Sequence, residues 1–100
     1  TGGTGVSPRD VTPEATRDVI ERELPGFSEA MRAESFKVTT RSIGSRAVSG
    51  MYKDTLIINL PGSPKGVSEC LGVVLEAIPH VLEVAGGNVS DCGKDVKPHS

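Results

Sequence analysis

The chain passes from an apolar strand through a turn into a helix within the stretch Thr55-Leu56-Ile57-Ile58-Asn59-Leu60-Pro61-Gly62-Ser63-Pro64. Leu56 to Ile58 form a continuous apolar run, so we expect helices to cover this strand on both faces. Ser63 can cap the helix that follows, and Pro64 suits its first position. In α/β proteins ligands bind outside the carboxyl ends of such strands, so this turn is a candidate for one edge of a site.

The same strand is the second arm of a predicted hairpin, whose first arm is residues 46–50 and whose turn is Tyr52-Lys53-Asp54. An apolar stripe then predicts a helix that ends or kinks at Pro79. The stripe consists of Val67, Cys70, Leu71, Val74, Leu75 and Ile78. The glycines and polar residues of 85–100 predict a flexible tail.

Upstream of the hairpin, the sequence predicts a glycine-rich loop over residues 1–12 and two helices. Thr12 is a good N-cap and Pro13 suits the first helical position, and helical spacing continues to Leu24. Pro25-Gly26 is expected to stop this first helix. A second helix is predicted over 27–36, followed by a polar loop or distorted turn over 37–44.

Composition excludes several classes of function. The formal net charge is −2 and basic and acidic residues are interspersed, so no positively charged patch predicts nucleic-acid binding. No apolar run is long enough to span a membrane, and no secretory leader is evident. Cys70 and Cys92 form neither a disulfide framework nor a CxxC metal pair, which favours a reducing, cytoplasmic compartment.

The first candidate for chemistry is the run Thr1-Gly2-Gly3-Thr4-Gly5. Glycines let backbone N–H groups turn toward a phosphate, and the threonine hydroxyls add donors. The run matches neither GxGxxG nor the Walker A pattern, so a plain turn is the alternative. Asp10 follows this loop; it suits a metal or phosphate site, and a helix-cap or surface aspartate is the alternative.

Two further segments suit anion recognition. Ser45-Arg46 offers a hydroxyl and a guanidinium for a phosphate or a pterin, against the alternative of a solvent-facing strand pair. Gly62 and Ser63 precede a helix whose N-terminus favours an anion, against the alternative of a capped turn.

Taken together, these segments closely resemble the molybdenum-cofactor G-domain family, which includes the G domain of gephyrin and the plant and bacterial molybdopterin adenylyltransferases. The resemblance covers residues 1–84, and 85–100 are left as the tail. It is carried by Thr1 to Gly5, Pro8-Arg9-Asp10-Val11-Thr12-Pro13-Glu14-Ala15-Thr16, Ser45-Arg46 and Thr55 to Ser63, in the family's order.

The resemblance implies a three-layer α/β/α sandwich with a mostly parallel sheet. It also implies a homotrimer that binds molybdopterin and transfers AMP from ATP, with Mg²⁺, to the molybdopterin phosphate. Asp10 would be the catalytic carboxylate near the Mg²⁺. Ser45 would contact molybdopterin with Arg46 beside it, and Gly62 and Ser63 would border the pocket. The loop that lines the molybdopterin-phosphate pocket would be Thr1, Gly2, Gly3, Thr4 and Gly5.

Two of the places where the sequence departs from the family's pattern bear on the site. Where the family has Thr-Pro-x-Ala-Met-Leu before Ser-Arg, this chain has Thr39-Thr40-Arg41-Ser42-Ile43-Gly44, which we expect to loosen the loop that presents Ser45. Family domains also place a strand, a helix and an acidic magnesium site before TGGTG. We therefore expect this chain to be the carboxyl-terminal part of the domain, to need the upstream segment as a partner and to be inactive alone. The alternatives to an enzyme are a non-catalytic molybdopterin-binding or scaffold module and a plain oligomerisation domain.

Overall fold

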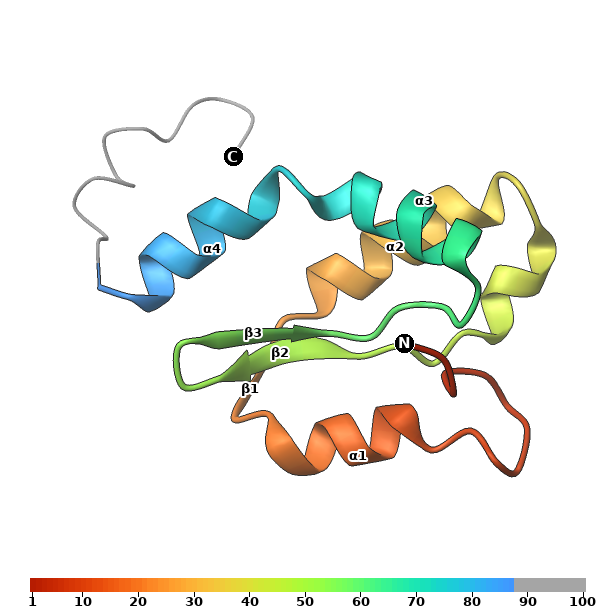
Figure 1. Cartoon of the computed structure of the whole chain (residues 1–100), viewed down its shortest axis with the longest axis horizontal. Coiled ribbons are helices and arrows are strands. Elements are labelled where there is room, and N and C mark those ends of the chain that lie inside the picture. The colour runs from red at the N-terminus through yellow and green to blue at the C-terminus, as the bar shows by residue number, and fades with distance from the viewer. Residues whose placement is uncertain (88–100) are drawn as a thin grey trace.

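The computed structural model describes residues 1–87, and these form three layers (Figure 1). A small sheet lies between α1 (Thr12–Val19) on one face and α2 (Pro25–Phe36) with α3 (Pro64–Val74) on the other. A further helix, α4 (Ala77–Ala85), follows α3. The predicted α/β/α layering is confirmed. Most of the predicted tail, residues 88–100, lies outside the described residues.

The sheet has the order β1 (Arg22–Glu23), β2 (Ser49–Tyr52) and β3 (Thr55–Ile58). The predicted hairpin is confirmed as β2 and β3, although β2 begins at Ser49 rather than at residue 46. Both pairings are antiparallel, so the mostly parallel arrangement is not found within residues 1–87. The reason is local: the two-residue turn after Tyr52 returns the chain directly along β2, with Lys53 at a φ of 52°.

Strand β1 lies in a segment where helical spacing predicted the end of the first helix. The backbone N–H groups of Glu21 and Leu24 donate to the carbonyl oxygens of Met51 and Ser49, each at 2.8 Å. The approach is close because residue 50 is glycine: a Cβ there would lie 2.5 Å from the Arg22 carbonyl oxygen. These contacts between distant segments end α1 at Val19.

The expectation that Pro25-Gly26 stops a helix is wrong, because Pro25 begins α2. A proline in the first turn loses no helical hydrogen bond. For the same reason Pro79 neither ends nor kinks the α3 helix; α3 ends at Val74, and Pro79 lies in the first turn of α4. A proline can therefore either begin a helix or follow the end of one, so its presence alone does not predict which of the two occurs.

The two predicted N-caps have different outcomes. Ser63 caps α3 as predicted, with its hydroxyl accepting from the Gly66 N–H at 3.0 Å. Thr12 is not the cap of α1: Val11 holds that position, without a side-chain hydrogen bond. The Thr12 hydroxyl instead donates to the Gly2 carbonyl oxygen at 2.7 Å, which joins the helix to the N-terminal loop.

The core lies between the sheet and the helices α2 and α3. Phe27 and Met31 of α2 pack with Cys70 and Val74 of α3, and all are buried. Half-buried side chains of the strand segment, among them Leu56 and Ile58, pack against this cluster. The prediction that Cys70 is a small core residue is confirmed. Within residues 1–87 no helix combines the length and the apolar character that crossing a membrane requires.

Candidate ligand-binding cleft

The N-terminal glycine loop adopts a backbone that only glycines adopt easily. Gly2 and Gly3 have φ values of 77° and 67°, and a Cβ on Gly3 would lie 2.4 Å from the Thr12 hydroxyl. The Gly2 N–H donates to the Leu60 carbonyl oxygen at 2.9 Å, and a Cβ on Gly62 would lie 3.4 Å from the Gly2 Cα. The loop therefore packs against the turn after β3, at one end of the sheet (Figure 1).

Arg46 joins the N-terminal loop to the segment before β2. Its backbone N–H donates to the Thr4 carbonyl oxygen at 2.7 Å. Its guanidinium donates to the carbonyl oxygens of Gly5 and Asp10, at 2.7 and 2.8 Å, and pairs with Glu14 of α1. Each nitrogen of this guanidinium is therefore bonded to the protein, and Arg46 holds the loop in place.

Asp10 closes the turn at the end of this loop. Its Oδ2 accepts from the Ser7 N–H at 2.9 Å, and its own N–H donates to the Ser7 carbonyl oxygen at 2.9 Å. Gly5 lies close enough that a Cβ on it would be 2.9 Å from Oδ2. Asp10 is thus held by the loop in a half-exposed position.

A second chain of hydrogen bonds fixes the loop from the sheet side. Asn59 is 4% exposed; its Oδ1 accepts from the Val48 N–H at 3.0 Å and its Nδ2 donates to the Thr16 hydroxyl at 2.8 Å. That hydroxyl donates to the Thr12 carbonyl oxygen at 2.8 Å, and the Thr12 hydroxyl reaches Gly2. Every buried polar atom on this path has a partner, which makes the path rigid.

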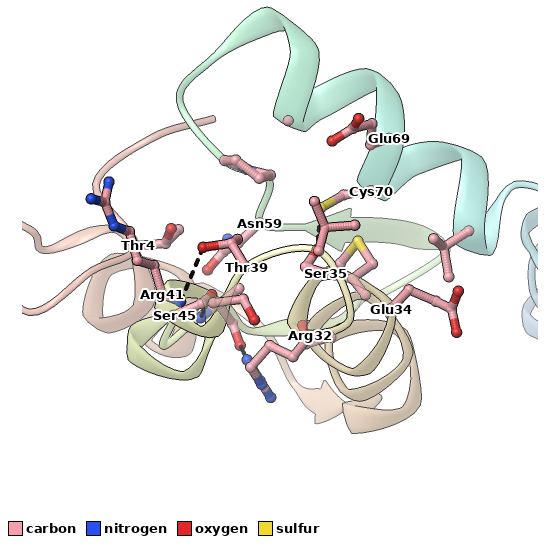
Figure 2. Close-up of a pocket in the computed structure, with 18 residues that line it drawn as sticks. Thr4, Arg32, Glu34, Ser35, Thr39, Arg41, Ser45, Asn59, Glu69 and Cys70 are labelled. Atoms are coloured by element: carbon pink, nitrogen blue, oxygen red, sulfur yellow. Dashed lines mark hydrogen bonds between the residues drawn. The ribbon is translucent and has the colours of Figure 1, made fainter.

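A cleft of about 530 Å³ opens between α2, α3 and the segment that leads to β2 (Figure 2). Residues 40–44, for which we expected a loosened loop, form the short 3₁₀-helix η1 (Thr40–Gly44), capped by the Thr39 hydroxyl. Its wall is mainly apolar and also carries hydroxyl and charged side chains. The lining includes Thr4, Thr39, Arg41, Ser45, Glu69 and Cys70.

The structure brings only some of the predicted site residues to this cleft. Thr4 and Ser45 line it together, although they lie far apart in the sequence. Arg46 lines a smaller neighbouring groove of about 360 Å³, which shares Ser45 with the cleft. The other predicted residues lie behind or beside these walls rather than in them: Thr1, Gly2, Gly3, Gly5, Asp10, Gly62 and Ser63.

Several residues of the cleft had no assigned role in the sequence. Asn59 gave one signal, a polar residue at the end of an apolar strand, where a buried amide is expected to hold a hydrogen-bond network. Arg41 gave none, because a lone charged side chain in a loop is ordinarily a solvated surface group. Only the tertiary structure places them on one cleft.

The ionisation of one group near the loop is perturbed. The Arg46 guanidinium, which donates to Glu14, holds the pKa of that carboxyl below its ordinary value. The ion pair is half-exposed, so its contribution to stability is modest.

A magnesium ion would find limited protein ligation here. Among residues 1–87 no three His, Cys, Asp or Glu side chains are grouped so as to hold a metal ion. Asp10 offers one carboxylate whose Oδ2 already accepts from a backbone N–H. Mg²⁺ is commonly held by one or two carboxylates, with substrate phosphates and water completing its shell. Asp10 therefore fits the role of a single ligand to such an ion.

The chain was compared with known protein families and proteins. Residues 1–80 match the family described as "Probable molybdopterin binding domain". The chain is similar to the molybdopterin adenylyltransferase of Helicobacter pylori strain J99, with 50% identity over 88 residues that make up 88% of this chain and 50% of the relative. It is also similar to the Drosophila melanogaster molybdenum cofactor synthesis protein cinnamon, 48% identical over 90 residues, or 90% of this chain and 15% of that protein.

Among solved structures, the molybdopterin biosynthesis enzyme MoaB from Thermus thermophilus superposes with a TM-score of 0.77 and 51% identity. The match covers 86% of this chain and 54% of that one. The α/β fold is therefore confirmed. The chain spans about half the length of the Helicobacter pylori relative.

Proposed function

The chain belongs to the family of probable molybdopterin binding domains, and from this membership we propose that it binds molybdopterin and takes part in transferring AMP from ATP to the molybdopterin phosphate. Relatives about 50% identical are named molybdopterin adenylyltransferase, which supports a place in molybdenum cofactor biosynthesis. One structural observation carries the proposal. Thr4 and Ser45 line one cleft while Arg46 bonds the Thr4 and Gly5 carbonyls.

The backbone of the glycine loop suits a phosphate. Gly2 uses its N–H on the Leu60 carbonyl oxygen, whereas in the described part of the chain the N–H groups of Gly3, Thr4 and Gly5 donate to no protein acceptor. Successive free N–H groups around left-handed glycines form an anion-binding concavity. Gly62 and Ser63 adjoin this loop at the N-terminus of α3, where the helix dipole also favours negative charge.

In the proposed reaction an oxygen of the molybdopterin phosphate attacks the α-phosphorus of ATP. The bond from that phosphorus to the oxygen bridging to the β-phosphate breaks, and pyrophosphate leaves with the bonding electron pair. No nucleophile from the protein is needed, because catalysis of this kind is mainly positioning and charge stabilisation. We assign the two tasks as follows: Ser45 and the Thr1–Gly5 loop position molybdopterin, and Asp10 is the catalytic carboxylate. Mg²⁺, held by Asp10, would supply neutralisation of the phosphate charges.

A second candidate is a non-catalytic molybdopterin-binding or scaffold module. It is favoured by the position of Asp10, which lines neither the cleft nor the neighbouring groove and whose Oδ2 is bonded to Ser7. The two candidates make the same prediction for binding and differ only in the transfer step.

The test is to measure molybdopterin binding and the formation of adenylylated molybdopterin from radiolabelled ATP with Mg²⁺. We expect Asp10→Asn to retain binding and to lower the transfer rate by at least a hundredfold, about 2.7 kcal/mol at the transition state. Ser45→Ala should weaken binding. Binding without transfer by the unmodified protein would favour the non-catalytic module, and an unchanged rate in Asp10→Asn would remove the role proposed for that residue.

We also propose that the protein assembles as a homotrimer and acts in the cytoplasm, as the family resemblance implies. Large exposed apolar side chains such as Val6, at 77% exposed, and Ile43, at 79%, offer surface for association. Light scattering of the purified protein would give the assembly mass, and cell fractionation would give the compartment.

A further inference from the structure

The cleft is lined by charges of both signs (Figure 2). The Arg41 side chain lies on the side of Thr4, whereas Glu69 on α3 and Glu34 on α2 lie away from it. Because all four residues line one cleft of about 530 Å³, a ligand that fills it meets a cation on the side of Thr4 and carboxylates away from it.

The Arg41 side chain is available while its backbone is fixed. Its N–H donates to the Thr39 hydroxyl at 3.2 Å, and η1 continues to the bond from the Ser45 N–H to the Ser42 carbonyl oxygen at 3.0 Å. Its guanidinium has no hydrogen bond or ion pair with any residue in the range 1–87. The guanidinium of Arg46 is occupied by the N-terminal loop, and Arg32 donates to the Ala47 carbonyl oxygen at 3.0 Å.

The two carboxylates that line the cleft, those of Glu34 and Glu69, differ in whether the protein already pairs them. Glu34 pairs with Lys37 at 2.8 Å, which balances its charge. Glu69 is exposed on α3, and its carboxylate has no partner in the described part of the chain. Glu69 is therefore the acceptor that remains free for a ligand.

We propose that Arg41 and Glu69 set the orientation of the ligand in the cleft, with an anionic group bound by Arg41 beside Thr4 and an N–H-bearing ring bound by Glu69. A guanidinium can donate two hydrogen bonds to phosphate oxygens, whereas an ionised carboxylate can only accept hydrogen bonds. A ligand bound the other way round would place its phosphate against the Glu69 carboxylate and its N–H donors against the donors of Arg41. This inference rests on the proposed function: molybdopterin carries a phosphate at one end and the amino and ring N–H donors of a pterin at the other.

The test titrates the protein by NMR with three probes: inorganic pyrophosphate, a pterin without phosphate, and molybdopterin. Arg41→Gln should weaken pyrophosphate binding about three- to tenfold and leave the affinity for the phosphate-free pterin unchanged. Glu69→Gln should do the opposite, and each variant should weaken molybdopterin binding. The matched controls are Arg22→Gln and Glu29→Gln, which change exposed charges away from the cleft and should alter none of the affinities.

The crossed pattern makes the proposal falsifiable, because both substitutions are at exposed positions and circular dichroism will check that the variants fold. It is overturned if Arg41→Gln behaves like Arg22→Gln, if each cleft variant weakens both small probes equally, or if neither probe binds. Failure of the proposed function looks different: molybdopterin would not bind, while pyrophosphate and the pterin still responded to Arg41 and Glu69 separately.

Discussion

The Nη2 atom of Arg46 donates a hydrogen bond to the carbonyl oxygen of Asp10 across 2.8 Å. The Nε atom of the same side chain donates to the Gly5 carbonyl oxygen at 2.7 Å, so one guanidinium holds both ends of the segment between these residues. Because both acceptors are backbone atoms, Arg46 fixes where Asp10 lies without engaging its carboxylate. Arg46 is therefore a positioning residue for the side chain that we propose as catalytic.

Replacing Arg46 by Gln should loosen this segment. We expect the free energy of unfolding to fall by about 1–3 kcal/mol, since hydrogen bonds from a half-exposed charged group are lost. Arg46→Lys should not restore the loss, because one ammonium lacks the planar fork that spans both carbonyls. Urea unfolding measures the effect, with Arg22→Gln as the control for loss of an exposed arginine. Equal stabilities of the two Gln variants would contradict the positioning role.

The ion pair between Arg46 and Glu14 predicts a pH dependence. The pKa of Glu14 is lowered, chiefly by its hydrogen bond from Arg46, so the folded protein holds the ionised form more strongly than the unfolded chain does. This contribution is present above the ordinary glutamate pKa and is lost as the pH falls through the lowered value. The melting temperature of the unmodified protein should therefore approach that of Glu14→Gln on acidification. A difference between the two that stays constant down to the lowest pH would contradict this.

The buried Asn59 is expected to be sensitive to substitution. Asn59→Leu leaves the Val48 N–H without an acceptor and removes the bond to Thr16, which should lower the free energy of unfolding by about 1–3 kcal/mol. Thr16→Val breaks the same network from α1, so the double variant should lose less than the sum of the two single losses. Thr16→Ser is the control that keeps the hydroxyl. Additive losses in urea unfolding would show that the two side chains act independently.

Two glycines should respond oppositely to alanine. Gly50→Ala places a Cβ 2.5 Å from the Arg22 carbonyl oxygen and should destabilise the protein by about 1–3 kcal/mol. At Gly72, in α3, a Cβ meets nothing within 4 Å, so Gly72→Ala should stabilise by about 0.5–1 kcal/mol. Thermal melts of the two variants give the signs. A Gly50→Ala protein as stable as the unmodified chain would mean that β1 does not pack on β2 as closely as described.

Two predictions that depended only on neighbours in sequence are confirmed. The Ser63 cap and the turn after Tyr52 are settled within a few residues, so the sequence predicts the start of α3 and the hairpin. The errors occur where distant segments compete with local preference. Residues 22–23 have the spacing of a helix but pair with β2, and this pairing ends α1 early.

Short runs of side-chain type encode the α/β class, the hairpin, the cap of α3 and the resemblance of two glycine-containing turns to one family, so these could be predicted from the sequence. Which groups face a ligand depends on how distant segments pack against one another. Thr4 and Ser45 meet at one cleft, Arg46 turns to the backbone of the loop, and Arg41 stands opposite Glu69. The reason is physical: a side chain is free for a ligand only if no distant group of the protein occupies it, and no local pattern of residues records that.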